Sequence, residues 1–202
     1  MDTIVLATNN KGKIKELSVM LESFGVTVKS LSQFPEIGDI PETGDTFLEN
    51  AFIKARTVAK ITGLVAVADD SGIEIDALDL RPGVYSARYA GDQCDDRANN
   101  EKMLNEMKDV PEDKRNGRYR CVMAAVAPNG TEINTDGAYE IQVAHGYKGD
   151  GGFGYDVIVK DPELDCHVAE LDAQVKNERS HRGKAMQKLL KLWPEFWEKA
   201  QK

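Results

Sequence analysis

The chain has little cysteine, and the cysteines that it has are far apart. Cys94, Cys121 and Cys166 are the only three among 202 residues, and no Cys-x-x-Cys pair or cluster of cysteine with histidine occurs. This scarcity argues against a zinc site built from sulfur and nitrogen ligands and against a disulfide framework. It is typical of a protein in a reducing, intracellular compartment.

The chain also lacks an excess of positive charge and a long apolar run. Its formal net charge is −8, so no overall basic field would attract a nucleic-acid backbone. No apolar run approaches the ~18 residues that a membrane helix needs. The opening residues, MDTIVLATNN, do not have the basic and then apolar pattern of a secretory signal. We therefore expect a cytoplasmic protein without nucleic-acid or membrane partners.

Hydrophobic residues make up 41% of the chain, which at this length predicts a single domain spanning residues 1–202. Apolar runs typical of strands alternate with segments of helical periodicity. Strands are predicted at residues 3–7, 26–31, 64–68, 72–78, 119–127, 131–144 and 157–160. Helices are predicted at residues 11–25, 46–63 and 95–110 and from about Ser180 onward. This order predicts a mixed α/β fold, in which a long twisted sheet carries helices on its faces and a cleft lies between two lobes.

Hydroxyl, amide and lysine donors follow the first predicted strand, where a helix is predicted to begin. They lie in the segment Thr8, Asn9, Asn10, Lys11, Gly12 and Lys13. A helix start favours a bound phosphate group, because its backbone N–H groups and its dipole attract anions. The segment is not a Walker A loop, since Thr8 and Ile14 replace required residues of that motif. A polar turn with solvated lysines remains the alternative.

Two adjacent acids, Asp69 and Asp70, follow the apolar run LVAVA and precede Ser71 and Gly72. Neighbouring carboxylates repel each other, and each is costly to bury. A divalent cation would make the pair favourable, whereas a solvated turn is the simpler alternative. Mg²⁺ is usually held by one or two carboxylates together with substrate phosphates and water. Asp70 and Glu42, from the acidic loop before the second predicted helix, are the expected ligands, and Mn²⁺ would suit the same oxygens.

Glycines and aromatic residues alternate in the segment GGFGYD. Glycine lets a ligand approach the backbone closely, Phe153 or Tyr155 could stack on a base, and Asp156 could accept a hydrogen bond from a ring N–H. A flexible bulge with core aromatics is the alternative.

Further along, His181 and Arg182 begin the last predicted helix, where the helix dipole disfavours cations. That position favours an anionic or carbonyl partner for both side chains.

Six segments, in this order, resemble the inosine triphosphate pyrophosphatases, a family also called Ham1-like proteins. They are LATNNKGKIKEL, ETGDTFLENAFIKA, ADDSG, PGVYSARYAG, GGFGYD and SHRGKA, and they extend from residue 6 to residue 185. The resemblance implies an elongated mixed α/β fold with a central active-site cleft, usually in a homodimer. It also implies hydrolysis of nucleoside triphosphates that carry deaminated purines, such as ITP, dITP and XTP, to the monophosphate and pyrophosphate.

The resemblance further implies a role for each matching residue. The triphosphate would be held by Thr8, Asn9, Asn10, Lys11, Gly12 and Lys13. Glu42 and Asp70 would bind magnesium, and Asp70 would also accept the proton of the attacking water. The remaining substrate contacts would come from Ser71, Phe153, Gly154, Tyr155, Asp156, Lys176, His181 and Arg182. Lys54 and Asp69 are expected to assist.

Two other functions fit parts of this pattern. A Maf-like pyrophosphatase acting on other modified nucleotides would share the reaction, but the GGFGYD and SHR segments argue against it. A nucleotide-binding regulator without hydrolytic activity would need the phosphate-binding segment but not Asp70 or the acidic loop.

Donors from His181 and Arg182 would favour a base with a keto oxygen at C6, because the amino group of adenine would leave them unpaired.

Overall fold

The structure, a computed structural model, describes residues 3–9, 14, 18, 21–22 and 24–202. The strands are β1 (Thr3–Leu6), β2 (Thr27–Ser30), β3 (Val65–Ile75), β4 (Asn116–Val126), β5 (Glu132–Val143), β6 (Val159–Asp161) and β7 (Cys166–His167). The helices are α2 (Phe47–Thr62), α3 (Asp96–Glu106), α4 (Ala173–Arg179) and α5 (His181–Ala200). The helix predicted at residues 11–25 falls largely outside the described residues. At its predicted end, Gly25 has a φ of +75°, which glycine adopts without steric cost.

The strands form one seven-stranded sheet in the order β2-β1-β3-β4-β5-β6-β7. β1 pairs in parallel with both β2 and β3. At the other end of the order, β6 pairs antiparallel with β5 and with β7. Parallel and antiparallel pairs in one sheet, with helices on its faces, confirm the predicted mixed α/β fold.

The chain divides into two compact units. Unit 1 comprises Met1–Asp70, Cys121–Asp136 and Ala185–Lys202, and unit 2 comprises Ser71–Arg120 and Gly137–Lys184. Each unit has its own cluster of buried apolar side chains. The predicted cleft between two lobes stays a prediction.

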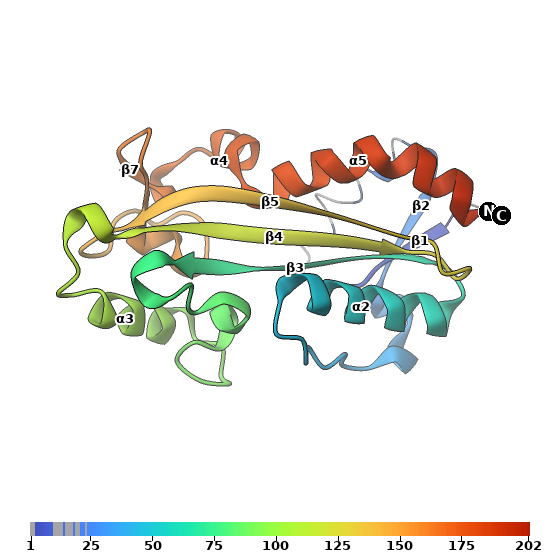
Figure 1. Ribbon diagram of the computed structural model, residues 1–202, viewed down its shortest axis with the longest axis horizontal. Coiled ribbons are helices and arrows are strands. Elements are labelled where there is room, and N and C mark those ends of the chain that lie inside the picture. The colour runs from blue at the N-terminus through green and yellow to red at the C-terminus, as the bar shows by residue number, and fades with distance from the viewer. Residues whose placement is uncertain (1–2, 10–13, 15–17, 19–20, 23) are drawn as a thin grey trace. The chain divides into compact units, whose positions relative to one another are not determined.

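The core of unit 1 lies between its strands and α5. Leu189, Trp193 and Phe196 of α5 are buried with Ile4 of β1 and Met123 of β4. α2 covers the other face of the same strands (Figure 1). Full burial of side chains of this size contributes about 1.5–3 kcal/mol each, so α5 is a major source of the stability of unit 1.

α2 confirms its predicted bounds almost to the residue. Thr46 caps the helix, because its hydroxyl accepts from the backbone N–H of Glu49 and the Glu49 carboxylate accepts from the backbone of Thr46. The helix ends at Gly63, which has a left-handed φ of 64°. Both devices satisfy backbone groups that a helix end leaves without partners.

The prediction of two strands separated by a turn at Asp69–Gly72 is wrong. β3 runs without interruption through these residues. The strand can continue because the charge of Asp70 is met locally by Lys54, whose Nζ lies 3.4 Å from Asp70 Oδ1. β1 nevertheless stops earlier, since its last paired residue, Leu6, lies opposite Val67. The acids therefore lie beyond the carboxyl end of the neighbouring parallel strand, as expected for a ligand site in an open α/β sheet.

Unit 2 contains a fully buried arginine, Arg115, which is 1% exposed. Its guanidinium donates to the backbone carbonyls of Val143, Ala144, Met107 and Val110. A buried charge is costly unless its donors are satisfied, and here the backbone satisfies them. Arg115 thereby ties the segment after α3 to the end of β5.

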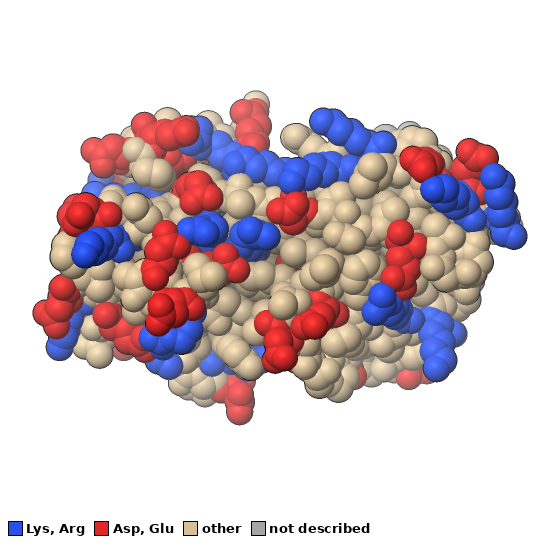
Figure 2. Space-filling view, in the orientation of Figure 1, with Lys and Arg blue, Asp and Glu red and all other residues tan. Residues whose placement is uncertain are grey.

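Charges of both signs are interspersed on the face that Figure 2 shows. Among the described residues, no helix is both long enough and apolar enough to cross a membrane.

Candidate active site

The first cluster of predicted site residues lies in unit 1 and consists of Glu42, Lys54 and Asp70. The ammonium group of Lys54 lies 2.7 Å from Glu42 Oε1 and 3.4 Å from Asp70 Oδ1. Asp70 is contributed by β3, Lys54 by α2, and Glu42 by the loop before α2. Asp70 is 8% exposed. One lysine thus bridges the two carboxylates that the resemblance assigns to the metal.

The start of α2 holds the loop that carries Glu42. The Glu49 carboxylate accepts from the backbone N–H groups of Asp45 and Thr46, at 2.8 and 3.0 Å. The buried Asn50 side chain accepts from the backbone N–H of Gly44 at 2.8 Å. Lys54 follows Asn50 by four residues, and residues at this spacing lie on one face of a helix. The cap therefore places the loop and the lysine on the same side of α2.

Burial and charge set the protonation of this cluster. Burial raises the pKa of Asp70 above its ordinary value, the charge of Lys54 opposes that shift, and the charge of Glu42 adds to it. For Lys54, burial alone would lower the pKa, but Asp70 and Glu42 outweigh it and the net shift is upward. Lys54 therefore stays charged, while Asp70 is a stronger proton acceptor than an exposed aspartate.

The oxygens of the cluster suit a magnesium ion. Asp70 Oδ2 is buried and has no hydrogen-bond partner among the residues that the structure describes. A buried carboxylate oxygen without a donor is costly, and a cation would satisfy it. Nowhere in the described ranges do three or more metal-binding side chains gather. A protein usually holds Mg²⁺ through one or two carboxylates, and substrate phosphates and water complete the coordination.

The other predicted residues of unit 1 follow β1. Thr8 is half-buried and Asn9 is exposed, directly after the strand. The backbone N–H of Ala7 donates to Val67 of β3 at 2.8 Å, which holds this strand end against β3. Asn10, Lys11, Gly12 and Lys13 lie outside the described residues.

The second cluster lies in unit 2 and centres on the Asp156 carboxylate, which is 3% exposed. Asp156 Oδ2 accepts from the Phe153 backbone N–H at 2.9 Å and from Lys176 Nζ at 2.5 Å. Asp156 Oδ1 accepts from the Tyr119 hydroxyl at 3.0 Å. The Asp156 carboxylate therefore holds the turn that contains Phe153. With three donors already bound, it has little remaining capacity to accept a hydrogen bond from a ligand.

Phe153 and Tyr155 differ sharply in exposure. The Phe153 ring is 64% exposed, and Lys176 Nζ lies 4.7 Å from its centroid. Tyr155 is buried, and its hydroxyl donates to the Ser86 carbonyl at 2.8 Å. Of the two aromatic candidates for stacking on a base, only Phe153 presents its ring to solvent.

α3 fixes the peptide that follows Phe153. Asn100 Nδ2 donates to the Gly154 carbonyl at 2.9 Å. The Gly154 N–H donates to Asp96 Oδ2 at 3.0 Å. Sequence reasoning missed this support, because the burial of Asn100 within a mostly polar helix is seen only in the structure.

The remaining predicted residues of unit 2 are Ser71 in β3, Lys176 in α4, and His181 and Arg182 at the start of α5. Ser71, His181 and Arg182 are each half-buried. The His181 imidazole stacks on the Tyr119 ring, with centroids 5.1 Å apart and planes 18° apart. Tyr119, which sequence reasoning also missed, thus links Asp156 to His181.

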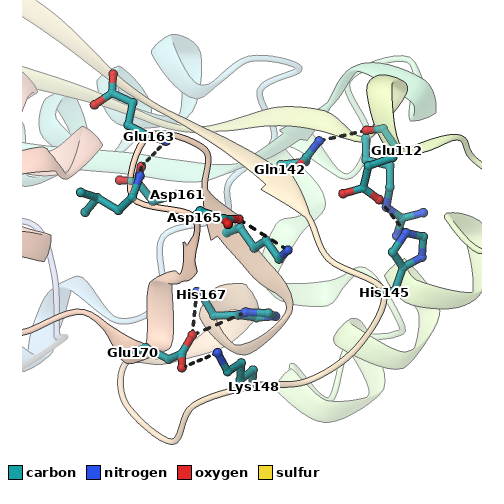
Figure 3. A network of polar contacts seen from close by, with 12 residues as sticks. Glu112, Gln142, His145, Lys148, Asp161, Glu163, Asp165, His167 and Glu170 are labelled. Atoms are coloured by element: carbon teal, nitrogen blue, oxygen red, sulfur yellow. Dashed lines mark hydrogen bonds and ion pairs between the residues drawn. The ribbon is translucent and has the colours of Figure 1, made fainter.

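The other two histidines belong to a separate polar network of unit 2, drawn in Figure 3. His145 Nε2 lies 2.7 Å from Glu112 Oε2. The His167 backbone N–H donates to Glu170, which also pairs with Lys148 at 2.9 Å. These contacts of the two histidines are with residues that were not predicted for the site.

Comparison with known proteins decides the family. A model of the Ham1 family matches residues 4–192. The chain belongs to the Ham1 family. The resemblance of the six sequence segments is thereby confirmed.

Relatives of this Ham1-family chain match it over nearly its full length. A dITP/XTP pyrophosphatase of Nitratidesulfovibrio vulgaris is 53% identical, and the match covers 96% of this chain and 97% of the relative. A dITP/XTP pyrophosphatase of Listeria monocytogenes is 46% identical, with both chains covered completely. Among solved structures, a HAM1 protein from Coxiella burnetii is 40% identical with a TM-score of 0.91, covering 96% of this chain and 100% of that one.

Proposed function

We propose that this chain hydrolyses nucleoside triphosphates with deaminated purine bases, namely ITP, dITP and XTP, to the monophosphate and pyrophosphate, and so clears them from the nucleotide pool. The observation that carries the proposal is the buried Asp70 carboxylate beside Glu42 and Lys54. Such a cluster suits a metal-assisted attack on a phosphate chain. Relatives named dITP/XTP pyrophosphatase over their full length support the same activity.

Glu42 and Asp70 are the residues that would hold Mg²⁺, or Mn²⁺ in its place. When bound, the ion would neutralise charge on the substrate's phosphate oxygens. Lys54 keeps its positive charge in the cluster and is placed to balance the carboxylates and to attract the triphosphate. We assign the triphosphate to the segment from Thr8 to Lys13 as well, on the basis of the resemblance.

Asp70 is the residue that we assign as general base. A water molecule forms a bond to the α-phosphorus, and the bond between that phosphorus and the bridging oxygen breaks. Pyrophosphate leaves with the electron pair, and the proton of the water passes to Asp70. A raised pKa suits this role, because a base accepts a proton most effectively when its pKa lies nearer the working pH.

We assign the base of the substrate to the cluster of unit 2. The exposed Phe153 ring is supported by Lys176 and held in place by the Asp156 carboxylate, as a stacking platform needs. Gly154 and Tyr155 complete this turn, and Ser71 remains a proposed substrate contact. His181 and Arg182 would donate to the keto oxygen at C6. Adenine offers a donor at that position, so it would leave these groups unpaired.

The decisive experiment is a substrate panel. Pyrophosphate release from ITP, XTP, GTP, ATP and dTTP should be measured with Mg²⁺ and again after the ion is removed with EDTA. We expect ITP and XTP to exceed the others by orders of magnitude in kcat/KM, and activity to vanish with EDTA and return with Mg²⁺. Preference for dTTP would favour a Maf-like enzyme. Binding without pyrophosphate release would favour a non-hydrolytic regulator.

The pH dependence of the reaction should respond to Lys54. In Lys54→Met, Asp70 loses the positive charge that opposes the rise of its pKa, so that pKa should rise further. Since the base must be deprotonated, the acid limb of kcat/KM for ITP should move to higher pH. A profile measured at fixed Mg²⁺ tests this, and a limb that moves to lower pH would contradict the assignment of Asp70.

Phe153→Ala should weaken substrate binding. Stacking of a base on an aromatic ring contributes ~1–3 kcal/mol, so KM for ITP should rise about tenfold while kcat changes little. Tyr85→Ala is the matched control, because Tyr85 is 54% exposed and carries Arg88 over its ring at 5.0 Å. An equal rise of KM in both variants would count against a platform at Phe153.

The quaternary structure and location remain proposals as well. We propose a homodimer, to be tested by sedimentation equilibrium, in a cytoplasmic protein whose residues 1–202 act as one pyrophosphatase domain. Thermal unfolding of the whole chain in a single cooperative transition is expected if that last proposal holds, and two separate transitions would contradict it.

A further inference from the structure

Tyr119 in β4 contacts two of the residues to which the proposed function assigns the base. It is 9% exposed. Its hydroxyl donates to Asp156 Oδ1 at 3.0 Å, and its ring stacks on the His181 imidazole at 5.1 Å. None of the six segments that carry the family resemblance includes this residue.

The hydrogen bond completes the coordination of a buried carboxylate. The other oxygen of Asp156 already accepts from Phe153 N and Lys176 Nζ. With each oxygen occupied from a different side, the carboxylate plane has one favourable orientation. That orientation fixes the backbone turn at Phe153 and the Lys176 ammonium group beside the Phe153 ring.

The Tyr119 hydroxyl can act only as a donor toward Asp156. Burial, with the adjacent charge of Asp156, raises the pKa of Tyr119 well above its ordinary value. The phenol therefore keeps its proton at neutral pH and can donate it to the carboxylate.

The ring contact restricts the imidazole of His181. His181 is the first residue of α5, a position where a side chain has few neighbours from its own helix. The nearly parallel Tyr119 ring, with planes 18° apart, limits rotation of the imidazole. A ring nitrogen can read the edge of a base only when its plane is set.

We infer that Tyr119 is a positioning residue of the base-binding cluster: its hydroxyl orients Asp156 and its ring sets the plane of His181. The inference rests on the proposed function, in which Asp156 and His181 belong to the part of the site that receives the base. Tyr119 itself touches no substrate and acts through these two residues.

The fold supplies a matched control one strand away. Tyr139 of β5 donates to Asp161 Oδ2 at 2.8 Å, and Asp161 is paired with Arg179 at 2.6 Å. Tyrosine, aspartate and a basic residue are thus combined as in Tyr119, Asp156 and Lys176. Tyr139→Phe removes the same kind of buried bond from residues that have no role in the proposed site.

The test of the hydroxyl compares kcat and KM for ITP and for ATP in Tyr119→Phe and Tyr139→Phe. Tyr119→Phe keeps the ring but frees the Asp156 carboxylate and so loosens the turn at Phe153; because a stacking platform serves any base, KM should rise about tenfold for both substrates while kcat changes little. Tyr139→Phe should leave both KM values as in the unmodified chain. If the two variants raise KM equally, or if Tyr119→Phe lowers kcat and leaves KM unchanged, the residue is merely structural and the inference fails. A starting chain with no preference for ITP would instead overturn the proposed function, and the inference with it.

The stacking of Tyr119 on His181 can be measured without an activity assay. The chain has three histidines, whose ring protons can be assigned by substituting His145 and His167 in turn. A ring current from Tyr119 should shift the His181 protons upfield, and Tyr119→Phe should keep that shift whereas Tyr119→Leu should abolish it. Should these variants not fold, the unmodified chain still decides, because unshifted His181 protons would contradict the stack.

Discussion

Asp70→Asn is expected to lower kcat for ITP by at least about a hundredfold. Amide oxygen cannot accept the proton that the attacking water must lose, and a positioned general base contributes roughly 10²–10⁴ in rate. The substitution keeps the size and shape of the side chain, so the fold should be retained. Rates of pyrophosphate release at saturating ITP and Mg²⁺ measure the effect. A variant that retains more than a tenth of the activity would remove Asp70 from the proton transfer.

The same variant should unfold at a higher temperature than the unmodified chain in the absence of metal. The raised pKa of Asp70 means that the folded chain holds this proton more tightly than the unfolded one. The contribution of Asp70 to stability is therefore greatest below its ordinary pKa of 3.8 and is lost as the pH rises through the raised value. Asparagine does not ionise, so the gain should be largest at neutral pH and should vanish near pH 3. Thermal unfolding in EDTA at both pH values checks this.

Arg182→Ala is expected to narrow the preference for ITP over ATP by about tenfold or more. Loss of a donor to a buried acceptor costs ~1–3 kcal/mol, and 1.4 kcal/mol corresponds to a factor of ten. The loss should fall on ITP, whose C6 oxygen accepts a hydrogen bond, and should spare ATP. The ratio of kcat/KM for the two substrates measures it.

Lys188→Ala is the control for this prediction. Lys188 lies in the same helix, α5, and makes an exposed ion pair with Asp136 at 3.2 Å. Its removal takes away one positive charge without touching the proposed site. An unchanged ITP-to-ATP ratio in Arg182→Ala, or an equal change in both variants, would count against readout of the C6 oxygen by Arg182.

Local signals made most of the fold predictable. α2 has a capping box at one end, Gly63 at the other and a regular apolar stripe between them, so all its determinants lie within its own residues. α4 and β7 went unpredicted because they have seven and two residues, too few for a periodic pattern. The break expected in β3 was wrong because the compensating charge, Lys54, lies 16 residues away in sequence.

The candidate residues that the sequence marks are those whose own motif carries the chemistry. Asp70 stands out because two adjacent acids directly follow a buried apolar run, Glu42 because it lies in an acidic loop without basic residues, and Phe153 because it lies between two glycines. Tyr119 and Asn100 escaped notice because each lies in a regular element and acts through contacts with distant segments. Alternation along a strand predicts that Tyr119 is buried, but not which carboxylate its hydroxyl meets.

Because β3 is unbroken, its two consecutive acids differ in the face of the sheet on which they lie. Side chains next to each other on an extended strand point to opposite faces of the sheet, so Asp69 and Asp70 are separated by the backbone although both are buried. A metal ion held by Asp70, as we propose, would therefore be expected to take its second carboxylate from another segment. The lysine that already joins Asp70 to Glu42 favours Glu42 as that second carboxylate.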